Sequence, residues 1–240
     1  MLFYLLRENL TVGEIFLQII MMFIAITLTF AFHEFMHAAT AVWLGDNTPK
    51  SMGRLTLNPL AHVDPTGAIL ILLIGFGWGR PVICNPAAYK RFKNRRLMDI
   101  MVSFAGPFGN FIMAFIATVV CTIIYCVAGE DFNPVVYVFY NIFSYLQIFS
   151  LGLMAFNLLP IYPLDGFKIL DNLIPLKLKY NSEVYKKYAV YGPRILLVLI
   201  ILGRLGGINI LGTVIEVFEI PAKLVLAVVQ IIIYAIFGAL

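Results

Sequence analysis

Two histidines and a glutamate that stand close together carry the clearest chemical signal. His33 and His37 are four residues apart, so in a helix their imidazoles project from one face, a turn apart. This spacing is typical of two ligands of a tetrahedral zinc ion, with Glu34 placed to act on the water that the ion activates. The pattern also arises by chance, and the three side chains could simply pack or snorkel. Its setting in a long apolar run favours chemistry, because ionisable groups are costly there and mark functional sites.

The composition is that of a membrane protein. Of the 240 residues, 61% are hydrophobic and only 12% are charged, against about 25% in soluble domains. The net charge of +4 does not indicate nucleic-acid binding, because the basic residues gather in loops between apolar segments, where they orient a membrane protein. The three cysteines fit neither a disulfide framework nor a cysteine-based zinc site. We expect one polytopic membrane domain over residues 1–240, with its first apolar segment retained in the mature chain.

The elements that must position these residues are helices. We expect an all-α polytopic membrane protein with about five to six transmembrane helices and a small re-entrant β-like element after the first helix. The apolar run at 68–74 is shorter than the ~20 residues that a crossing needs, which favours re-entry. Alternation over 51–58 before a proline predicts a strand and a turn, and 208–220 has the pattern of an interfacial amphipathic helix. The expected spans are 12–44, 97–127, 134–159, 188–202 and 224–240.

Basic loops orient the expected spans. The positive-inside rule places the loops at 80–96 and 168–187 in the cytoplasm and the acidic turn at 130–131 outside. The third span then runs inward and brings Asp165 toward the cytoplasmic side. For Asp165 to approach His33, the first helix must also run inward, and the chain between them must begin and end on that side. This requirement independently favours a re-entrant segment at 66–80.

A catalytic zinc ion normally takes three protein ligands and keeps a fourth position for water. No glutamate occurs between residues 35 and 129, which removes one common source of the third ligand. Asp165 is the best remaining candidate. It follows Pro160 and Pro163, which break the third span and free backbone groups that need protein or a water-filled cavity. Asp165 and the glycine after it could equally form a simple turn at a helix end.

The motif around His33, together with Ala-Gly-Pro-Phe-Gly-Asn at 105–110 and Asn-Leu-Leu-Pro-Ile-Tyr-Pro-Leu-Asp-Gly at 157–166, resembles the site-2 protease family of intramembrane zinc metalloproteases. The segments 53–59 and 77–82 look like the connecting segment of compact prokaryotic members, which have no PDZ or CBS domain. The resemblance covers roughly residues 20–200. It implies an integral multi-pass protein of the prokaryotic cell membrane. The basic loops place the active site toward the cytoplasm.

The resemblance also implies a ligand set and a reaction. It implies His33, His37 and Asp165 as zinc ligands and Glu34 as general acid/base. The reaction is hydrolysis of peptide bonds within or near transmembrane segments of membrane-anchored substrates, as in regulated intramembrane proteolysis. In such chemistry zinc acidifies water, and the glutamate carries the proton to the leaving amine.

Further residues are candidates for substrate contact. A strand-like edge could hold an unwound substrate by β-addition; it would comprise Arg54, Leu55, Thr56 and Leu57. Asn110 and Asn157 could bind the substrate backbone or the developing oxyanion. Asn110 could instead make a hydrogen bond between helices, and Asn157 could satisfy backbone groups near the helix break. For His62 we expect a turn contact rather than a role as ligand.

Two other classes of function use the same residues. A metal-binding transporter or channel could employ the histidine and aspartate cluster, but it should show a polar path or an internal repeat, and we find neither in the sequence. A protein of this fold without protease activity is a third hypothesis, against which the intact set of four residues argues. The expected partners are the bilayer and a transmembrane protein or peptide substrate, with no nucleic acid; the oligomeric state stays open.

Overall fold

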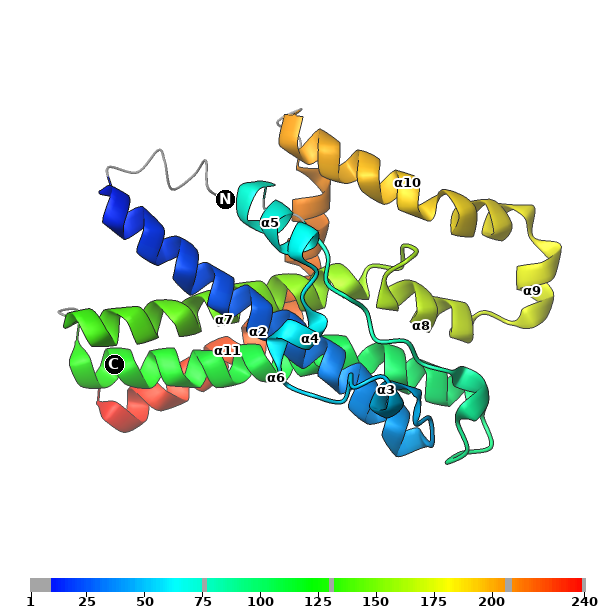
Figure 1. Ribbon diagram of the computed structural model, residues 1–240, viewed down its shortest axis with the longest axis horizontal. Coiled ribbons are helices and arrows are strands. Elements are labelled where there is room, and N and C mark those ends of the chain that lie inside the picture. The colour runs from blue at the N-terminus through cyan, green and yellow to red at the C-terminus, as the bar shows by residue number, and fades with distance from the viewer. Residues whose placement is uncertain (1–9, 75–76, 130–131, 206–208, 239–240) are drawn as a thin grey trace.

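The computed structural model describes residues 10–74, 77–129, 132–205 and 209–238, and every regular element in these ranges is helical (Figure 1). The single β pairing within these ranges is an isolated bridge between Val63 and Gly79. The predicted all-helical class is confirmed. The elements are α2 (Val12–Leu44), α3 (Thr48–Ser51), α4 (Pro59–His62), α5 (Pro65–Ile74), the 3-10 turn η1 (Pro86–Ala88), α6 (Arg95–Ala128), α7 (Pro134–Leu158), α8 (Asp165–Leu173), α9 (Leu176–Asn181), α10 (Glu183–Leu205) and α11 (Ile210–Phe237).

Four of the described helices are long and apolar enough to cross a membrane, namely α2, α6, α7 and α11. The shortest, α7, has 25 residues and would reach ~37 Å at ~1.5 Å per residue, more than the ~30 Å of a bilayer core. The chain is therefore an integral membrane protein. Helix α10 is not among the four because its apolar part, Val190–Gly203, is shorter than a span. The expected count of five to six is not confirmed.

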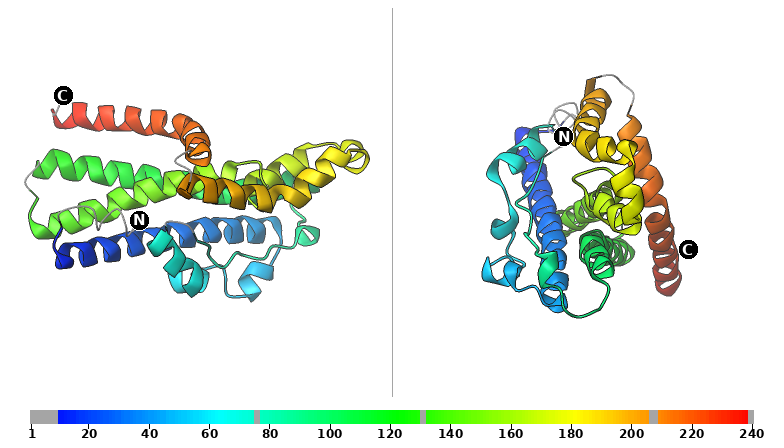
Figure 2. Two further views of the ribbon diagram at one scale, coloured as in Figure 1. Left: turned by 90° about the horizontal axis from the view of Figure 1, so that it is seen from above. Right: turned by 90° about the vertical axis from the view of Figure 1, so that its right-hand side faces the viewer.

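Helices α2, α6 and α7 run side by side and form the centre of the molecule (Figures 1 and 2). Small side chains let them approach closely: Ala25 of α2 and Ala117 of α6 are fully buried in one cluster with Leu146 of α7. The later part of α11 packs on the outer side of α6 and α7, where Ala222 and Leu226 join a second cluster. This bundle fixes the helix that carries the two histidines.

Both ends of α2 are capped. At its start, Thr11 and Glu14 form a capping box, in which each side chain bonds the other residue's backbone N–H. At its end, Gly45 takes a left-handed conformation with φ of 111°, which an L side chain rarely adopts. The predicted first span, 12–44, is confirmed.

The strand predicted at Arg54–Leu57 does not form. The chain leaves α3, turns at Gly53 and enters α4. Side-chain hydrogen bonds fold this segment onto α4: His62 Nε2–H donates to the Thr56 carbonyl over 2.9 Å, and the Arg54 guanidinium donates to the Ala61 carbonyl. The alternation of residue types here reflects a loop folded on itself rather than an extended edge.

The region after α4 returns on itself. Helix α5 has ten residues, about 15 Å at ~1.5 Å per residue, so it is too short to cross a bilayer. Arg80 N–H donates to the His62 carbonyl over 2.7 Å, beside the bridge from Val63 to Gly79. The two arms touch through their backbones, since a Cβ atom on Gly67 would lie 1.9 Å from the Trp78 carbonyl oxygen. Residues 75 and 76, which join the two arms in the sequence, lie outside the described residues.

The interfacial helix predicted at 208–220 is not a separate element. Residue 208 lies outside the described residues, and α11 runs without interruption from Ile210 to Phe237. Pro221 removes one backbone hydrogen bond and bends the helix without ending it (Figure 2). Glu219 and Lys223 pair over 2.6 Å across this bend. Glu216 and Glu219, which lie within the predicted interfacial range, therefore belong to a candidate span.

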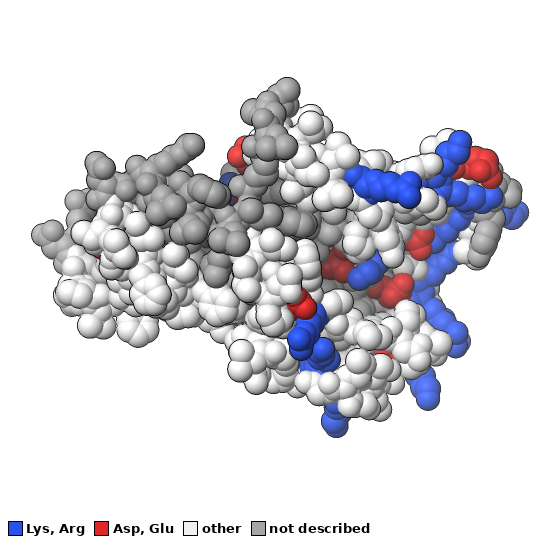
Figure 3. All heavy atoms as spheres, turned by 45° about the horizontal axis from the view of Figure 1, so that its top comes forward, with Lys and Arg blue, Asp and Glu red and all other residues white. Residues whose placement is uncertain are grey.

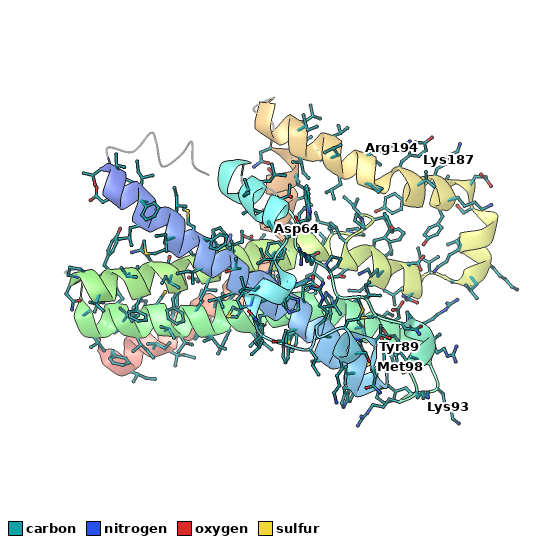
Figure 4. The ribbon with its side chains drawn as sticks, viewed as in Figure 1. Asp64, Tyr89, Lys93, Met98, Lys187 and Arg194 are labelled. Carbon is teal, nitrogen blue, oxygen red and sulfur yellow. The ribbon has the colours of Figure 1, made fainter. Side chains whose placement is uncertain are left out.

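Lysine and arginine side chains gather at one end of the molecule, around α8, α9 and the start of α6 (Figure 3). Figure 4 shows Lys93 and Lys187 at this end, on opposite sides of the fold. Tyr89 and Met98 lie nearer the middle of the molecule than Lys93 and pack with Leu44, so the end of α2 is held against the start of α6 (Figure 4). The acidic turn at residues 130–131, predicted for the other side of the membrane, lies outside the described residues.

Candidate active site

Three of the predicted site residues converge although 128 positions separate His37 from Asp165. The Nε2 atoms of His33 and His37 are 3.0 Å apart. Asp165 Oδ2 lies 3.3 Å from the first and 3.1 Å from the second. All three side chains are buried, and one ligating atom of each lies within 4.8 Å of the others. Two imidazoles and a carboxylate in this arrangement can share one metal ion.

A glycine of α6 makes room for the imidazoles. A Cβ atom on Gly106 would lie 2.3 Å from His37 Nε2 and 2.6 Å from His33 Cε1. Real Cβ atoms do not come so close to other heavy atoms, and neither ring can retreat because both sit on the buried face of α2. The glycine of the Ala-Gly-Pro sequence in α6 is therefore required, because any side chain at this position would collide with the two histidines.

Hydrogen bonds at the other ring nitrogen orient the histidines. His37 Nδ1 lies 2.7 Å from the Val102 carbonyl oxygen, which can only accept, so Nδ1 carries the proton and Nε2 is left as the ligating atom. His33 Nδ1 lies 3.0 Å from the Asn110 amide nitrogen, and the Asn110 Oδ1 atom is buried without a hydrogen-bond partner among the described residues. A metal on His33 Nε2 would leave Nδ1 protonated, and turning the amide would then give Oδ1 its missing donor. The donor set and this unpaired oxygen fit a zinc site.

Asp165 is the first residue of α8, where the positive end of the helix dipole stabilises a carboxylate. Burial would raise the pKa of Asp165, but the imidazoles of His37 and His33 hold that pKa well below its usual range. Its two oxygens have different neighbours: Oδ2 faces the imidazoles, and Oδ1 lies 2.9 Å from Lys168 Nζ.

Helix α8 is anchored to the helix that orients the histidines. Near the end of α8, the Asn172 amide donates to Asp99 Oδ2 of α6 over 2.6 Å. At its start, Gly166 packs against the end of α7, since a Cβ atom there would lie 2.2 Å from the Leu158 carbonyl oxygen. Helix α6 thus contacts both histidines and the helix that carries Asp165.

The carboxylate of Glu34 lies beside an extended strap, which we define as residues 80–85. Glu34 Oε2 accepts a hydrogen bond of 2.7 Å from the Val82 backbone N–H. Hydrogen bonds fix the strap at both ends. The Arg80 backbone N–H donates to the His62 carbonyl over 2.7 Å, and the Asn85 backbone N–H donates to Asp46 Oδ2 over 2.6 Å. One oxygen of Glu34 is therefore held in place, and the other can take a proton.

The remaining candidates lie elsewhere. The Asn157 amide donates to the Leu153 carbonyl one turn back on α7, over 3.0 Å, so it serves its own helix. His62 makes the turn contact to Thr56 that we predicted. Sequence reasoning missed the roles of Lys168, Gly106 and Val82. Of these three, only the role of Lys168 could have been predicted from the sequence, because Lys168 follows Asp165 by one helical turn.

Comparison with known proteins gives the family. The model of Peptidase family M50 matches residues 130–200. The chain is 43% identical over 161 residues to "Putative zinc metalloprotease YwhC" of Bacillus subtilis (strain 168), an alignment that covers 65% of this chain and 71% of that protein. The chain belongs to peptidase family M50, the site-2 proteases. This M50 peptidase is therefore a metalloprotease, and zinc is its metal.

More distant relatives carry a similar name. This M50 peptidase is 28% identical over 144 residues to "Putative zinc metalloprotease Rip2" of Mycolicibacterium smegmatis, and 28% identical over 140 residues to the protein of that name in Mycobacterium tuberculosis (strain H37Rv). Each alignment covers 58% of this chain and 51% of the relative, so the chain spans about half of their length. No solved structure matches the chain significantly.

Proposed function

We propose that this M50 peptidase cuts peptide bonds within or near the transmembrane segments of membrane-anchored substrates, with residues 1–240 acting as one domain. In this proposal His33, His37 and Asp165 hold the zinc ion and Glu34 is the general acid/base. The observation that carries the proposal is the meeting of three ligating atoms within 4.8 Å inside a bundle of membrane-length helices.

The reaction divides between the metal and this chain's residues. Bound zinc supplies the Lewis acidity that makes water a nucleophile near neutral pH. Glu34 takes a proton from the attacking water and returns it to the leaving amine. The Val82 N–H holds Oε2 of Glu34, so the carboxylate presents its other oxygen in a constant direction. To Asn110 we assign the orientation of His33 rather than contact with an oxyanion, because its amide already lies against Nδ1.

A cavity of about 560 Å³ supports the access of a membrane segment. It lies between α2, α5, α7, α10 and α11 and begins one turn before His33, at Phe30. Its walls are mostly apolar, and Glu219 of α11 adds one carboxylate. A helical substrate must unwind there, because its carbonyls are otherwise bonded within the helix. Apolar walls suit a lipid-embedded peptide.

Substrate pairing along Arg54–Leu57 would require that segment to straighten on binding, because the Thr56 carbonyl is bonded to His62 in the free protein. A Thr56→Pro variant tests this edge, since proline disfavours the pairing of an extended strand. Unchanged cleavage by that variant would remove the edge from the proposal.

We also propose that the active site faces the cytoplasm and that α5 is re-entrant. We propose α10 as a fifth span because its 23 residues are long enough for a crossing, although its apolar part is shorter. The basic end of the molecule, at α8 and the start of α6, supports the orientation, and the contact between Val63 and Gly79 supports re-entry. Single cysteines introduced at Lys93 and Asn133 in a cysteine-free variant can be labelled in intact cells with an impermeant maleimide. Labelling at Lys93 but not at Asn133 would contradict the orientation.

The decisive experiment compares wild type with Glu34→Gln on tagged single-span substrates, with zinc measured in both proteins. We expect the variant to keep zinc and to lose cleavage, because the amide cannot accept the proton. Glu183→Gln, which changes an exposed glutamate, is the matched control and should cleave normally. Equal cleavage by wild type and Glu34→Gln would refute the assignment of Glu34.

A further inference from the structure

The two oxygens of the Asp165 carboxylate have different partners, and Lys168 binds one of them. Its ammonium lies 2.9 Å from Oδ1, whereas Oδ2 is the oxygen that faces both imidazoles. The aspartate side chain is 5% exposed and the lysine side chain 53%, so the ammonium reaches from a solvent-accessible position to a buried carboxylate. Such a charge-assisted hydrogen bond fixes both the direction and the charge of the oxygen that it binds.

We propose that Lys168 makes Asp165 bind the metal through one carboxylate oxygen only. This inference rests on the ligand set of the proposed function. A carboxylate can bind a metal through one oxygen or through both. A catalytic zinc site has three protein ligands and water in the fourth position, and a second carboxylate oxygen would enter as a fifth ligand and crowd that water. Lys168 withholds Oδ1 from the metal and so preserves the place where water is activated. It is a positioning residue, since it acts through Asp165.

An ordinary surface ion pair would not have this effect, and the chain contains one for comparison. Lys186 and Glu183 have the same i,i+3 spacing and a distance of 3.0 Å, but the glutamate is 74% exposed. Water can replace either partner of such a pair, which is why exposed pairs contribute little. Asp165 is buried, so loss of the lysine leaves Oδ1 without its partner and free to turn to the metal.

The test uses the full chain in detergent, with Co²⁺ in place of zinc. The visible absorption of Co²⁺ is strong in four-coordinate sites and weaker when a fifth ligand binds. The variants are Lys168→Met, Lys168→Arg, which keeps a donor, and the control Lys186→Met. We expect Lys168→Met to bind one Co²⁺ per chain with reduced absorption, and its zinc form to show kcat lowered about 10-fold, as is usual for partners of metal ligands, with KM unchanged. The other two variants should resemble wild type.

Two results would overturn the inference. One is a wild-type spectrum and kcat in Lys168→Met, and the other is failure of that variant to bind Co²⁺, since the lysine would then be needed to form the site. The spectrum requires no substrate, so it can be read even if no cleavage is found. An Asp165→Ala variant separates the two proposals: a wild-type spectrum there would refute the ligand set itself.

Discussion

At the scale of single residues, the two imidazoles are oriented by different kinds of group. His37 bonds a backbone carbonyl, that of Val102, which no side-chain substitution at that position removes. His33 depends on a side chain, Asn110, which is fully buried. The second contact can therefore be tested directly.

Substitutions of Asn110 distinguish an orienting role from an oxyanion role. Asn110→Leu removes the partner of His33 Nδ1, and we expect zinc affinity to fall by about 10- to 100-fold in a chelator competition. Asn110→Asp keeps an acceptor for Nδ1–H but loses the amide donor, so it should bind zinc as wild type does. If Asn110→Asp keeps zinc and loses kcat, the amide instead stabilises the oxyanion, as the sequence also allowed.

The sequence predicted the three converging residues because each rests on a simple rule. The four-residue spacing places His33 and His37 on one face of any helix, and Asp165 follows a pair of prolines that had to break a span. The contact of Glu34 with Val82 could not be predicted, because 48 residues separate a side chain from a backbone N–H that follows no periodic pattern. Any residue except proline supplies such a donor.

At the scale of elements, the strap at 80–85 is held at both ends and touches Glu34 in its middle. It belongs to the segment where sequence reasoning was weakest. Periodicity detects helices such as α2 and α7, but the described residues between 46 and 90 form short helices and turns joined by side-chain to backbone bonds. Alternating residue types in such a segment have no sheet to pair with, and the strand prediction failed for that reason.

Val82→Pro tests the strap without altering its ends. Proline has no backbone N–H, so the bond to Glu34 is lost, while Val82→Ala keeps it. We expect Val82→Pro to keep its zinc and to lower kcat about 10-fold or more, as loss of a residue that orients a proton carrier does, and Val82→Ala to cleave normally. Equal kcat in the two variants would show that Glu34 needs no support from the strap.

At the scale of the whole molecule, the ligand set joins helices far apart in the sequence. His33 and His37 come from the first span and Asp165 from the short helix after the third. The sequence predicted spans at the positions of α2, α6 and α7. It could not show that α11 is continuous, because a proline with charged neighbours on both sides is as typical of a helix end as of a bend.

Removal of zinc should destabilise the folded protein. An ion that binds the folded state alone stabilises it by about 2.7 kcal/mol when its concentration is 100 times Kd. We expect a chelator to lower the thermal unfolding midpoint of wild type in detergent, because the chelator removes the ion that joins α2 to α8. His33→Ala should unfold at the same temperature with and without chelator. A chelator effect of equal size in both proteins would mean that the stabilising ion lies elsewhere.

Helix α6 carries Val102 and Asn110 against the imidazoles and Asp99 against the helix of Asp165. A sideways displacement of this one helix would therefore misalign both nitrogen donors and release the carboxylate in the same movement. The three metal ligands are therefore brought together or separated in one step. A change in the lipid around α6 should then abolish metal binding as a whole rather than remove one ligand at a time.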